Sequence, residues 1–227
     1  MISIPVIAID GPAASGKGAV AQAIAEQLGF HYLDSGAIYR AAALAVIHAE
    51  KNIDSPDLSE TDLAEIASGM HLSFKSGEIW LSNQNITDAI RTEACGNNAS
   101  KIAVLPRLRK ALLELQQSFR RTPGLVAEGR DMGTVVFPDA GLKIYLTASA
   151  QVRAERRYKQ LMEKGINANI RDLLNEIELR DTRDLSRSVA PLRTGNDTIT
   201  IDTTTLDLAQ SIEAVLKFYK RNTANKM

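Results

Sequence analysis

The stretch PVIAIDGPAASGKGAVAQAIAEQL, residues 5–28, determines the fold class of this chain. Its apolar, β-branched start, Pro5–Ile9, predicts a buried strand. Its alanine-rich end, Ala19–Leu28, has apolar residues at helical spacing and predicts a helix that ends at Gly29. Between them, glycines allow backbone N–H groups to point toward one centre beside the helix N-terminus. The stretch therefore predicts a strand, a phosphate-binding loop and a helix in succession.

The loop matches the P-loop spacing G-x-x-x-x-G-K, in which the lysine, Lys17, reaches the outer phosphates of a nucleoside triphosphate. The pattern then requires Ser or Thr, but this chain has Gly18 followed by Ala19. An ordinary glycine turn with an exposed lysine is the alternative, and the strand–helix context favours phosphate binding. The loop does not distinguish a kinase from a switch GTPase or a motor. The residues predicted to bind ATP are Gly11, Pro12, Ala13, Ala14, Ser15, Gly16, Lys17, Gly18 and Ala19.

The rest of the chain alternates short apolar strands with helices, which is typical of a doubly wound parallel sheet. Further strands are predicted at 30–33, 124–128, 141–146 and 197–202, and helices at 37–50, from Ser59, 99–120 with a break at Pro106, 151–165, 169–187 and 206–219. Residues 71–90 interrupt the alternation and predict a small antiparallel meander. We therefore expect an α/β fold with a five-stranded parallel sheet of the P-loop NTPase type, helices on both faces, an inserted meander and a helical lid.

Composition narrows the partners and the compartment. Lys plus Arg and Asp plus Glu both number 27 in 227 residues, so the formal net charge is zero and a nucleic-acid partner is not expected. The single cysteine, Cys95, excludes an internal disulfide framework and favours a reducing compartment. No apolar run is long enough to span a bilayer. We expect a cytoplasmic monomer without a membrane partner.

Two arginines follow predicted strands, Arg40 one helical turn after the second strand and Arg130 directly after the third. Ligands of such sheets bind beyond the carboxyl ends of the strands. The guanidinium fork matches a phosphate and keeps its charge, so the two positions favour a second phosphate site. The alternative is that each is a surface arginine in an ion pair.

A second arginine-rich region lies in the two predicted helices 151–165 and 169–187. Arg153, Arg156 and Arg157 share one helix face, and Arg180, Asp184 and Arg187 share another. These helices could form a lid that folds arginines over a transferring phosphoryl group and excludes water. Alternatively they are solvated helices stabilised by pairs such as Glu176 with Arg180.

Other chemistries are not indicated by the sequence. His31, His48 and His71 form no zinc-ligand pattern, and no G-x-S-x-G motif occurs. The Asn-Lys-x-Asp element by which GTPases read guanine is missing, because the only Asn-Lys pair is Asn225-Lys226 in the tail.

Several longer motifs occur together: IDGPAASGKG, LDSGAIYR, NNAS before LPRLR, EGRDMGTVVFPDA and RDTRDLSRSVAPL. In these motifs the chain resembles the bacterial-type cytidylate kinases, and the resemblance covers nearly its whole length. It implies in-line transfer of the γ-phosphoryl group of ATP, with Mg²⁺, to CMP or dCMP in a lid-closed site. It also implies a single domain, 1–227, with a monophosphate-binding part at about 35–106 that includes the insert 71–90, and a lid at about 152–187.

The resemblance also implies roles for individual residues. The base would be held by Ser100, Arg109 and Asp131, the monophosphate by Arg40, Arg130 and Arg187, and the sugar by Arg180 and Asp184, with Ser35 also in the CMP site. Arg157 would join from the lid on the ATP side, and the catalytic set would be Lys17, Arg130, Arg187 and Arg157.

Cytosine offers an amine donor and two acceptors, which suit a carboxylate and an arginine. Uracil reverses part of this pattern, so a preference for CMP over UMP is expected. Relatives usually have threonine at the position of Ala19. No protein ligand for Mg²⁺ is therefore assigned, and we expect the ion on phosphates and water.

Two alternatives remain open at this point. One is another acceptor, such as UMP or a non-nucleotide. The other is a nucleotide-dependent switch or binding module, which would not need Arg40, Arg130 and Arg187 facing the phosphate loop.

Overall fold

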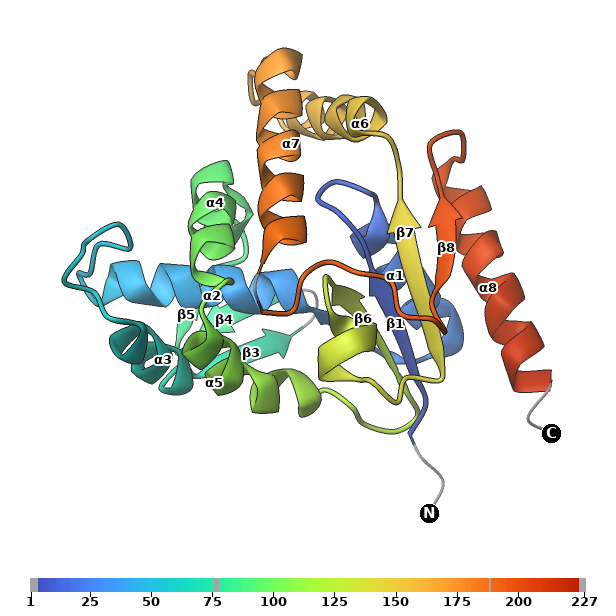
Figure 1. The fold of residues 1–227 in the computed structure, drawn as a ribbon, viewed down its shortest axis with the longest axis horizontal. Helices are drawn as coiled ribbons and strands as arrows, with labels where there is room; N and C mark the ends of the chain where they lie inside the picture. The colour runs from blue at the N-terminus through green and yellow to red at the C-terminus, as the bar shows by residue number, and fades with distance from the viewer. Residues whose placement is uncertain (1–3, 76–77, 188, 225–227) are drawn as a thin grey trace. The chain divides into compact units, whose positions relative to one another are not determined.

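The computed structural model describes residues 4–75, 78–187 and 189–224, and the chain forms two compact units (Figure 1). Unit 1 comprises residues 1–33 and 119–227, and unit 2 comprises residues 34–118. Among the described residues, no helix has the length and apolar character needed to cross a membrane.

Unit 1 is built on a five-stranded sheet in the order β2-β6-β1-β7-β8. The strands are β1 (Val6–Asp10), β2 (His31–Asp34), β6 (Leu125–Gly129), β7 (Leu142–Thr147) and β8 (Ile199–Asp202). The central strand β1 pairs in parallel with β6 on one side and with β7 on the other, so that Ile9 lies opposite both Glu128 and Ile144. The predicted parallel sheet is confirmed, and the carboxyl ends of β1, β6 and β7 meet at one edge.

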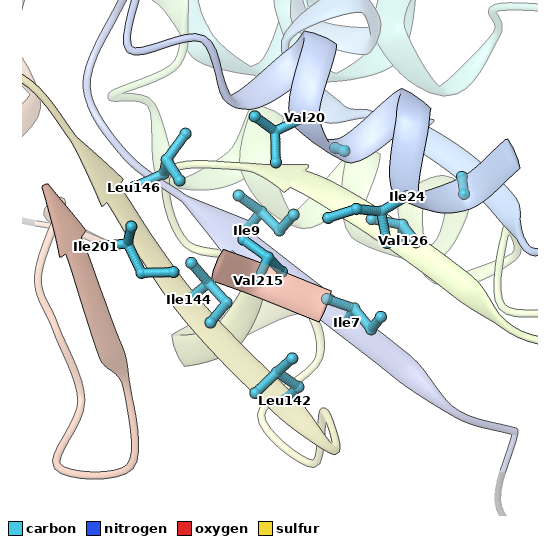
Figure 2. Packing of buried hydrophobic residues seen from close by; sticks show 12 residues of the cluster. Ile7, Ile9, Val20, Ile24, Val126, Leu142, Ile144, Leu146, Ile201 and Val215 are labelled. Atoms are coloured by element: carbon cyan, nitrogen blue, oxygen red, sulfur yellow. The ribbon is translucent and has the colours of Figure 1, made fainter. Parts of the chain in front are cut away.

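One hydrophobic cluster in the core of unit 1 packs helices against this sheet. Every residue of β1 and of β6 is buried, which explains why both strands are nearly continuous apolar runs. Figure 2 shows Ile9 of β1 and Ile144 of β7 facing Val20 and Ile24 of α1 (Lys17–Leu28). Val215 of α8 (Leu208–Ala224) completes this packing. Burial of each such side chain stabilises the fold by about 1.5–3 kcal/mol, so the core holds β1 and its following loop firmly in place.

The described residues of unit 2 form four α-helices, a short 3-10 helix at Ala89–Arg91 and the predicted meander. The helices are α2 (Ser35–His48), α3 (Glu60–Ser68), α4 (Glu93–Ile102) and α5 (Pro106–Gln117). The antiparallel strands are β3 (Leu72–Lys75), β4 (Glu78–Leu81) and β5 (Gln84–Asn85). The predicted turn at Ser76-Gly77 lies outside the described residues. Ser59 and Asp62 form a reciprocal capping box, which confirms the helix start expected there.

Several helix boundaries differ from those predicted. The helical segment expected from residue 99 begins at Glu93, because the Thr92 side chain accepts a hydrogen bond from the Cys95 N–H and caps it. Pro106 does not merely interrupt this helix but starts α5, since proline is tolerated in a first turn. The closing helix α8 runs beyond the predicted end at residue 219, to Ala224. A π-helical turn over Met132–Val136, after β6, was not predicted.

In unit 1, two helices follow β7 (Figure 1). They are α6 (Ala150–Glu163) and α7 (Ile170–Ser186), and they correspond to the two charged helical stretches of the sequence. The side chains of Ser149 and Asn169 cap the N-termini of these helices by accepting hydrogen bonds from backbone N–H groups of the first turn. Whether these helices act as a lid remains a prediction, as does the proposed division of the chain at about 35–106 and 152–187.

Candidate functional site

The loop between β1 and α1 has the geometry that phosphate binding requires. Gly16 precedes the helix with φ 87°, in the left-handed region that favours glycine. A Cβ atom on Gly11 would lie 2.1 Å from the carbonyl oxygen of Leu146, so the loop backbone runs directly against β7. No side chain caps the N-terminus of α1. Its first N–H groups are therefore directed into the loop, where they can bind an anion.

Lys17 is buried at the start of α1, beside oxygen atoms of Pro12 and Glu128. Its ammonium donates to the carbonyl of Pro12 at 3.2 Å and lies 3.7 Å from the Glu128 carboxylate. Glu128 is buried in β6 and accepts a hydrogen bond from the Tyr32 hydroxyl at 3.1 Å. Sequence reasoning assigned no role to Glu128. The sequence signal that could have identified it is a carboxylate within an otherwise apolar strand. That strand, β6, pairs with β1, which precedes the phosphate loop.

Gly18 occupies the position that usually carries a hydroxyl, and Glu128 fills the adjoining space. A Cβ atom on Gly18 would lie 2.9 Å from the carboxylate oxygen of Glu128. The hydroxyl of Ser15 is buried and has no hydrogen-bond partner among the described atoms, whereas Ala19 is exposed. A carboxylate and a hydroxyl beside the loop are oxygen ligands that suit Mg²⁺. Among the described residues, no group of three or more His, Cys, Asp or Glu side chains could hold a metal ion.

Arg130, at the end of β6, forms an ion pair with Asp184 of α7. The distance from Nε of Arg130 to the carboxylate is 2.6 Å, and Arg187 pairs with the other oxygen of the same carboxylate. Burial alone would raise the pKa of Asp184, but the two guanidinium groups hold it below its usual value. Burial would lower the pKa of Arg130, but Asp184 raises it. All three groups stay charged, and guanidinium groups of this kind can also bind a phosphate.

Asp131, the next residue after Arg130, is buried at the start of the π-helical turn. Asp10, at the end of β1, accepts hydrogen bonds from the backbone N–H groups of Met132 and Gly133. Burial, reinforced by the charge of Asp131, raises the pKa of Asp10 to about 6 despite these hydrogen bonds and Arg130. Asp10 was not among the residues predicted from the sequence.

Two arginines of α6 hold the phosphate loop from outside. Arg153 donates to the Ala13 carbonyl at 3.0 Å and pairs with Asp181 of α7 at 2.5 Å. Arg156 donates to the carbonyls of Ser15 at 3.3 Å and Thr203 at 2.6 Å. Neither arginine is therefore simply a solvated helix residue. The two predicted residues Arg157 and Arg180 are both partly buried, and a guanidinium nitrogen of Arg157 lies 3.5 Å from the Gln160 side-chain oxygen.

In unit 2, four predicted residues lie on three helices, Ser35 and Arg40 on α2, Ser100 on α4 and Arg109 on α5. The Ser35 hydroxyl donates to the side chain of Gln116 at 2.8 Å.

The Arg109 guanidinium donates to the Ala103 carbonyl at 3.0 Å, and its carbon lies 5.8 Å from the centre of the Tyr39 ring. The Cys95 thiol donates to the Arg40 carbonyl at 3.4 Å, which joins α4 to α2. Arg109 and Arg40 are thus positioned within this unit by neighbouring helices.

The family model for cytidylate kinase matches residues 7–221. The chain is 52% identical over 217 residues to the cytidylate kinase of Nitrosomonas europaea, covering 96% of each chain. It is 53% identical over 220 residues to the cytidylate kinase of Cupriavidus necator, covering 96% of this chain and 97% of that one.

The chain belongs to the cytidylate kinase family. It is a nucleoside-monophosphate kinase, and the family's activity is ATP-dependent phosphorylation of CMP. A gluconokinase from Sinorhizobium meliloti has a similar fold, with a TM-score of 0.50 at 16% identity over 98% of this chain and 95% of that one. The resemblance found in the sequence is therefore confirmed, together with the P-loop kinase fold.

Proposed function

We propose that this member of the cytidylate kinase family transfers the γ-phosphoryl group of ATP in line to CMP or dCMP, with the α6–α7 lid closed over the reacting groups. One observation in unit 1 carries the proposal. Gly129 lies opposite Asp10 in the register of β6 and β1, so the phosphate loop, which follows Asp10, and Arg130, which follows Gly129 and pairs with Asp184, leave neighbouring strands at the same edge of the sheet. A loop suited to ATP and an arginine cluster suited to a second phosphate therefore start from adjacent strand ends. A switch protein would need only the first of these.

Phosphoryl transfer requires mainly positioning and neutralisation of charge. In our proposal Lys17 binds the outer phosphates of ATP, Arg130 and Arg187 bind the CMP phosphate, and Arg157 joins from the lid. Arg153 and Arg156 support the transfer indirectly because they hold carbonyl oxygens of the loop. Closure would exclude water, which otherwise competes with CMP as the acceptor.

We assign the cytosine base to Ser100, Arg109 and Asp131, the sugar to Arg180 and Asp184, and further phosphate contacts to Arg40 and Ser35. The chemistry of the base supports this assignment, because a carboxylate accepts from the exocyclic amine and an arginine donates to the ring acceptors. In uracil a carbonyl replaces the amine, so a buried Asp131 would face an acceptor. The monophosphate-binding part would span about 35–106, including the insert 71–90.

Members of an ATP-dependent kinase family generally use Mg²⁺, and Glu128 and Ser15 would hold it here. The ion would neutralise charge on the phosphates and orient them. The buried carboxylate and the buried, unpartnered hydroxyl support this assignment. Since Lys17 lies beside Glu128, the carboxylate also keeps the lysine in place in the nucleotide-free protein.

We test the metal assignment with Glu128→Gln, using the exposed Glu213→Gln as the control. Affinity of the protein for Mn²⁺ in the presence of a non-hydrolysable ATP analogue, measured by electron paramagnetic resonance, is expected to fall about tenfold in the first variant only. Equal affinity in both variants would contradict a role for Glu128 in metal binding.

The reaction itself is tested by ADP release from ATP with a panel of monophosphates. We expect turnover with CMP and dCMP, and a CMP-over-UMP ratio of kcat/KM that collapses in Asp131→Ala. An equal preference in wild type and variant would refute the assignment of the base to Asp131. ADP release that does not depend on an acceptor would favour an ATPase or a switch. Inversion of configuration at a chiral phosphorus is the outcome expected for a single in-line transfer.

We expect the chain to act as a monomer. Light scattering coupled to gel filtration tests this expectation. The zero net charge supports small-molecule substrates rather than nucleic acid.

A further inference from the structure

Asp10 links the phosphate loop to the turn that follows β6. It is the last residue of β1, it immediately precedes Gly11, and it is 5% exposed. Its two carboxylate oxygens accept separate hydrogen bonds, one from the Met132 N–H at 2.8 Å and one from the Gly133 N–H at 2.9 Å. A single side chain thus connects the start of the loop with the turn Met132–Val136.

This turn needs a partner from outside. A helical segment begins with N–H groups that have no acceptor in the segment itself. The residue at its N-cap position, Asp131, makes no side-chain capping hydrogen bond to it. Asp10 supplies the missing acceptors from a neighbouring strand. The residues directly before the capped N–H groups are Arg130 and Asp131, both of which we assign to the acceptor nucleotide.

Close packing leaves the turn little freedom to shift. Met132 is fully buried, and its terminal methyl carbon lies 2.9 Å from the place where a Cβ on Gly129 would be. A Cβ on Gly133 would lie 3.1 Å from a side-chain carbon of Lys143. The carboxylate of Asp10 therefore meets its two N–H groups at positions already defined by packing.

We propose that Asp10 is a positioning residue that sets Arg130 and Asp131 relative to the phosphate loop. The proposal rests on the proposed function, because it takes Arg130 and Asp131 as acceptor-binding residues. Beyond the pairing of β1 with β6, the gap between the bound triphosphate and the acceptor would be adjusted by the covalent link from Asp10 to Gly11 and the two hydrogen bonds. Phosphoryl transfer is sensitive to such positioning, since small misplacements of reacting groups slow it strongly.

The electrostatics support a role beyond packing. A buried carboxylate is costly when ionised, and burial together with Asp131 raises the pKa of Asp10 to about 6, although Arg130 and the two hydrogen bonds oppose this. A neutral asparagine would cap one N–H group at lower cost, but its amide offers one acceptor oxygen instead of two. The carboxylate is the group that satisfies both N–H groups together.

The test compares Asp10→Asn with the control Asp139→Asn, which changes an exposed carboxylate paired with Arg120 in the same unit. We expect the first variant to fold, to exchange the amide hydrogens of Met132 and Gly133 at least tenfold faster by NMR, and to lose tenfold or more in kcat/KM for CMP. The dissociation constant for ATP without an acceptor should change less than twofold. The control should match wild type in all three measurements.

Several outcomes would overturn the proposal. One is unchanged exchange and unchanged kinetics in Asp10→Asn. Another is a weakening of ATP binding as large as the loss in kcat/KM for CMP, because Asp10 would then act on the phosphate loop alone. A third is that neither Asp10→Asn nor Asp10→Ser gives a folded protein with a cooperative unfolding transition, which would make the residue purely structural. A wild-type chain that does not phosphorylate CMP would instead refute the proposed function, and with it this role of Asp10.

Discussion

The phosphate loop and the Arg130–Asp184–Arg187 cluster bind charge in different ways, although both belong to unit 1. The loop relies on backbone N–H groups whose directions follow from Gly11, Gly16 and the close approach to β7. The cluster relies on side chains that balance one another, two guanidinium groups on one carboxylate. The loop is therefore sensitive to shape, and the cluster is sensitive to the removal of any one charge.

The largest effect is expected from the one side-chain charge of the loop. Lys17→Ala removes a cation that no backbone group replaces, so kcat should fall about 10³-fold, or about 4 kcal/mol in the barrier. The free energy of unfolding should fall by less than in the cluster variant Asp184→Ala, because the Glu128 carboxylate, 3.7 Å from the lysine, keeps its hydrogen bond from Tyr32. Steady-state kinetics and thermal melting measure the two effects, with the exposed Lys217→Ala as the control. A kcat in Lys17→Ala within tenfold of wild type would contradict the role of this lysine.

The cluster should show the opposite behaviour, a large effect on stability. Asp184→Ala leaves Arg130 and Arg187 facing each other without their anion, at an expected cost of about 3 kcal/mol in the free energy of unfolding. Asp139→Ala removes an exposed partner of Arg120 and should cost less than about 1 kcal/mol. Urea denaturation measures both values. Equal losses of unfolding free energy in the two variants would show that burial of the cluster does not increase its contribution to stability.

Asp10, which joins the two regions, is expected to make stability depend on pH. Its pKa rises from 3.8 to about 6 on folding, so the folded state holds the proton more tightly than the unfolded state. The resulting stabilisation is fully present below pH 3.8 and is lost as pH rises through about 6, for a total of about 3 kcal/mol. The unfolding free energy of wild type minus that of Asp10→Asn should fall by most of this amount, about 2 kcal/mol, between pH 4 and pH 7. A difference that does not vary with pH would show that the carboxyl keeps its ordinary pKa.

The smallest effect is expected at Ala19, which lies two positions after the P-loop lysine and carries no hydroxyl. Because Ala19 is exposed and we propose Glu128 and Ser15 as the oxygen ligands of Mg²⁺, Ala19→Thr should lower the KM for ATP by only about twofold, or about 0.4 kcal/mol. ATP titrations at fixed Mg²⁺ measure the change. An unchanged KM and an unchanged kcat would count against any role for a hydroxyl at this position.

Local sequence patterns were sufficient for much of the fold. The glycine spacing of the loop, the apolar runs of β1 and β6 and the caps at Ser59 and Gly29 depend on neighbours within a few residues, so their geometry could be predicted. Boundaries failed where a cap was overlooked, as at Thr92. The π-helical turn after Asp131 could not be predicted, because its N–H groups are satisfied by Asp10, which is distant in sequence.

The sequence by itself determined the parallel α/β fold, the phosphate loop and the family, because these depend on residue order and on long motifs. Only the tertiary structure showed that Glu128 fills the space beside Gly18 and that Arg153 and Arg156 hold the loop carbonyls. It also showed that Asp10 caps the turn after β6. These contacts join strands and helices that are far apart in the chain. Tertiary packing determines which groups a buried charge contacts, and a local sequence pattern does not predict that packing.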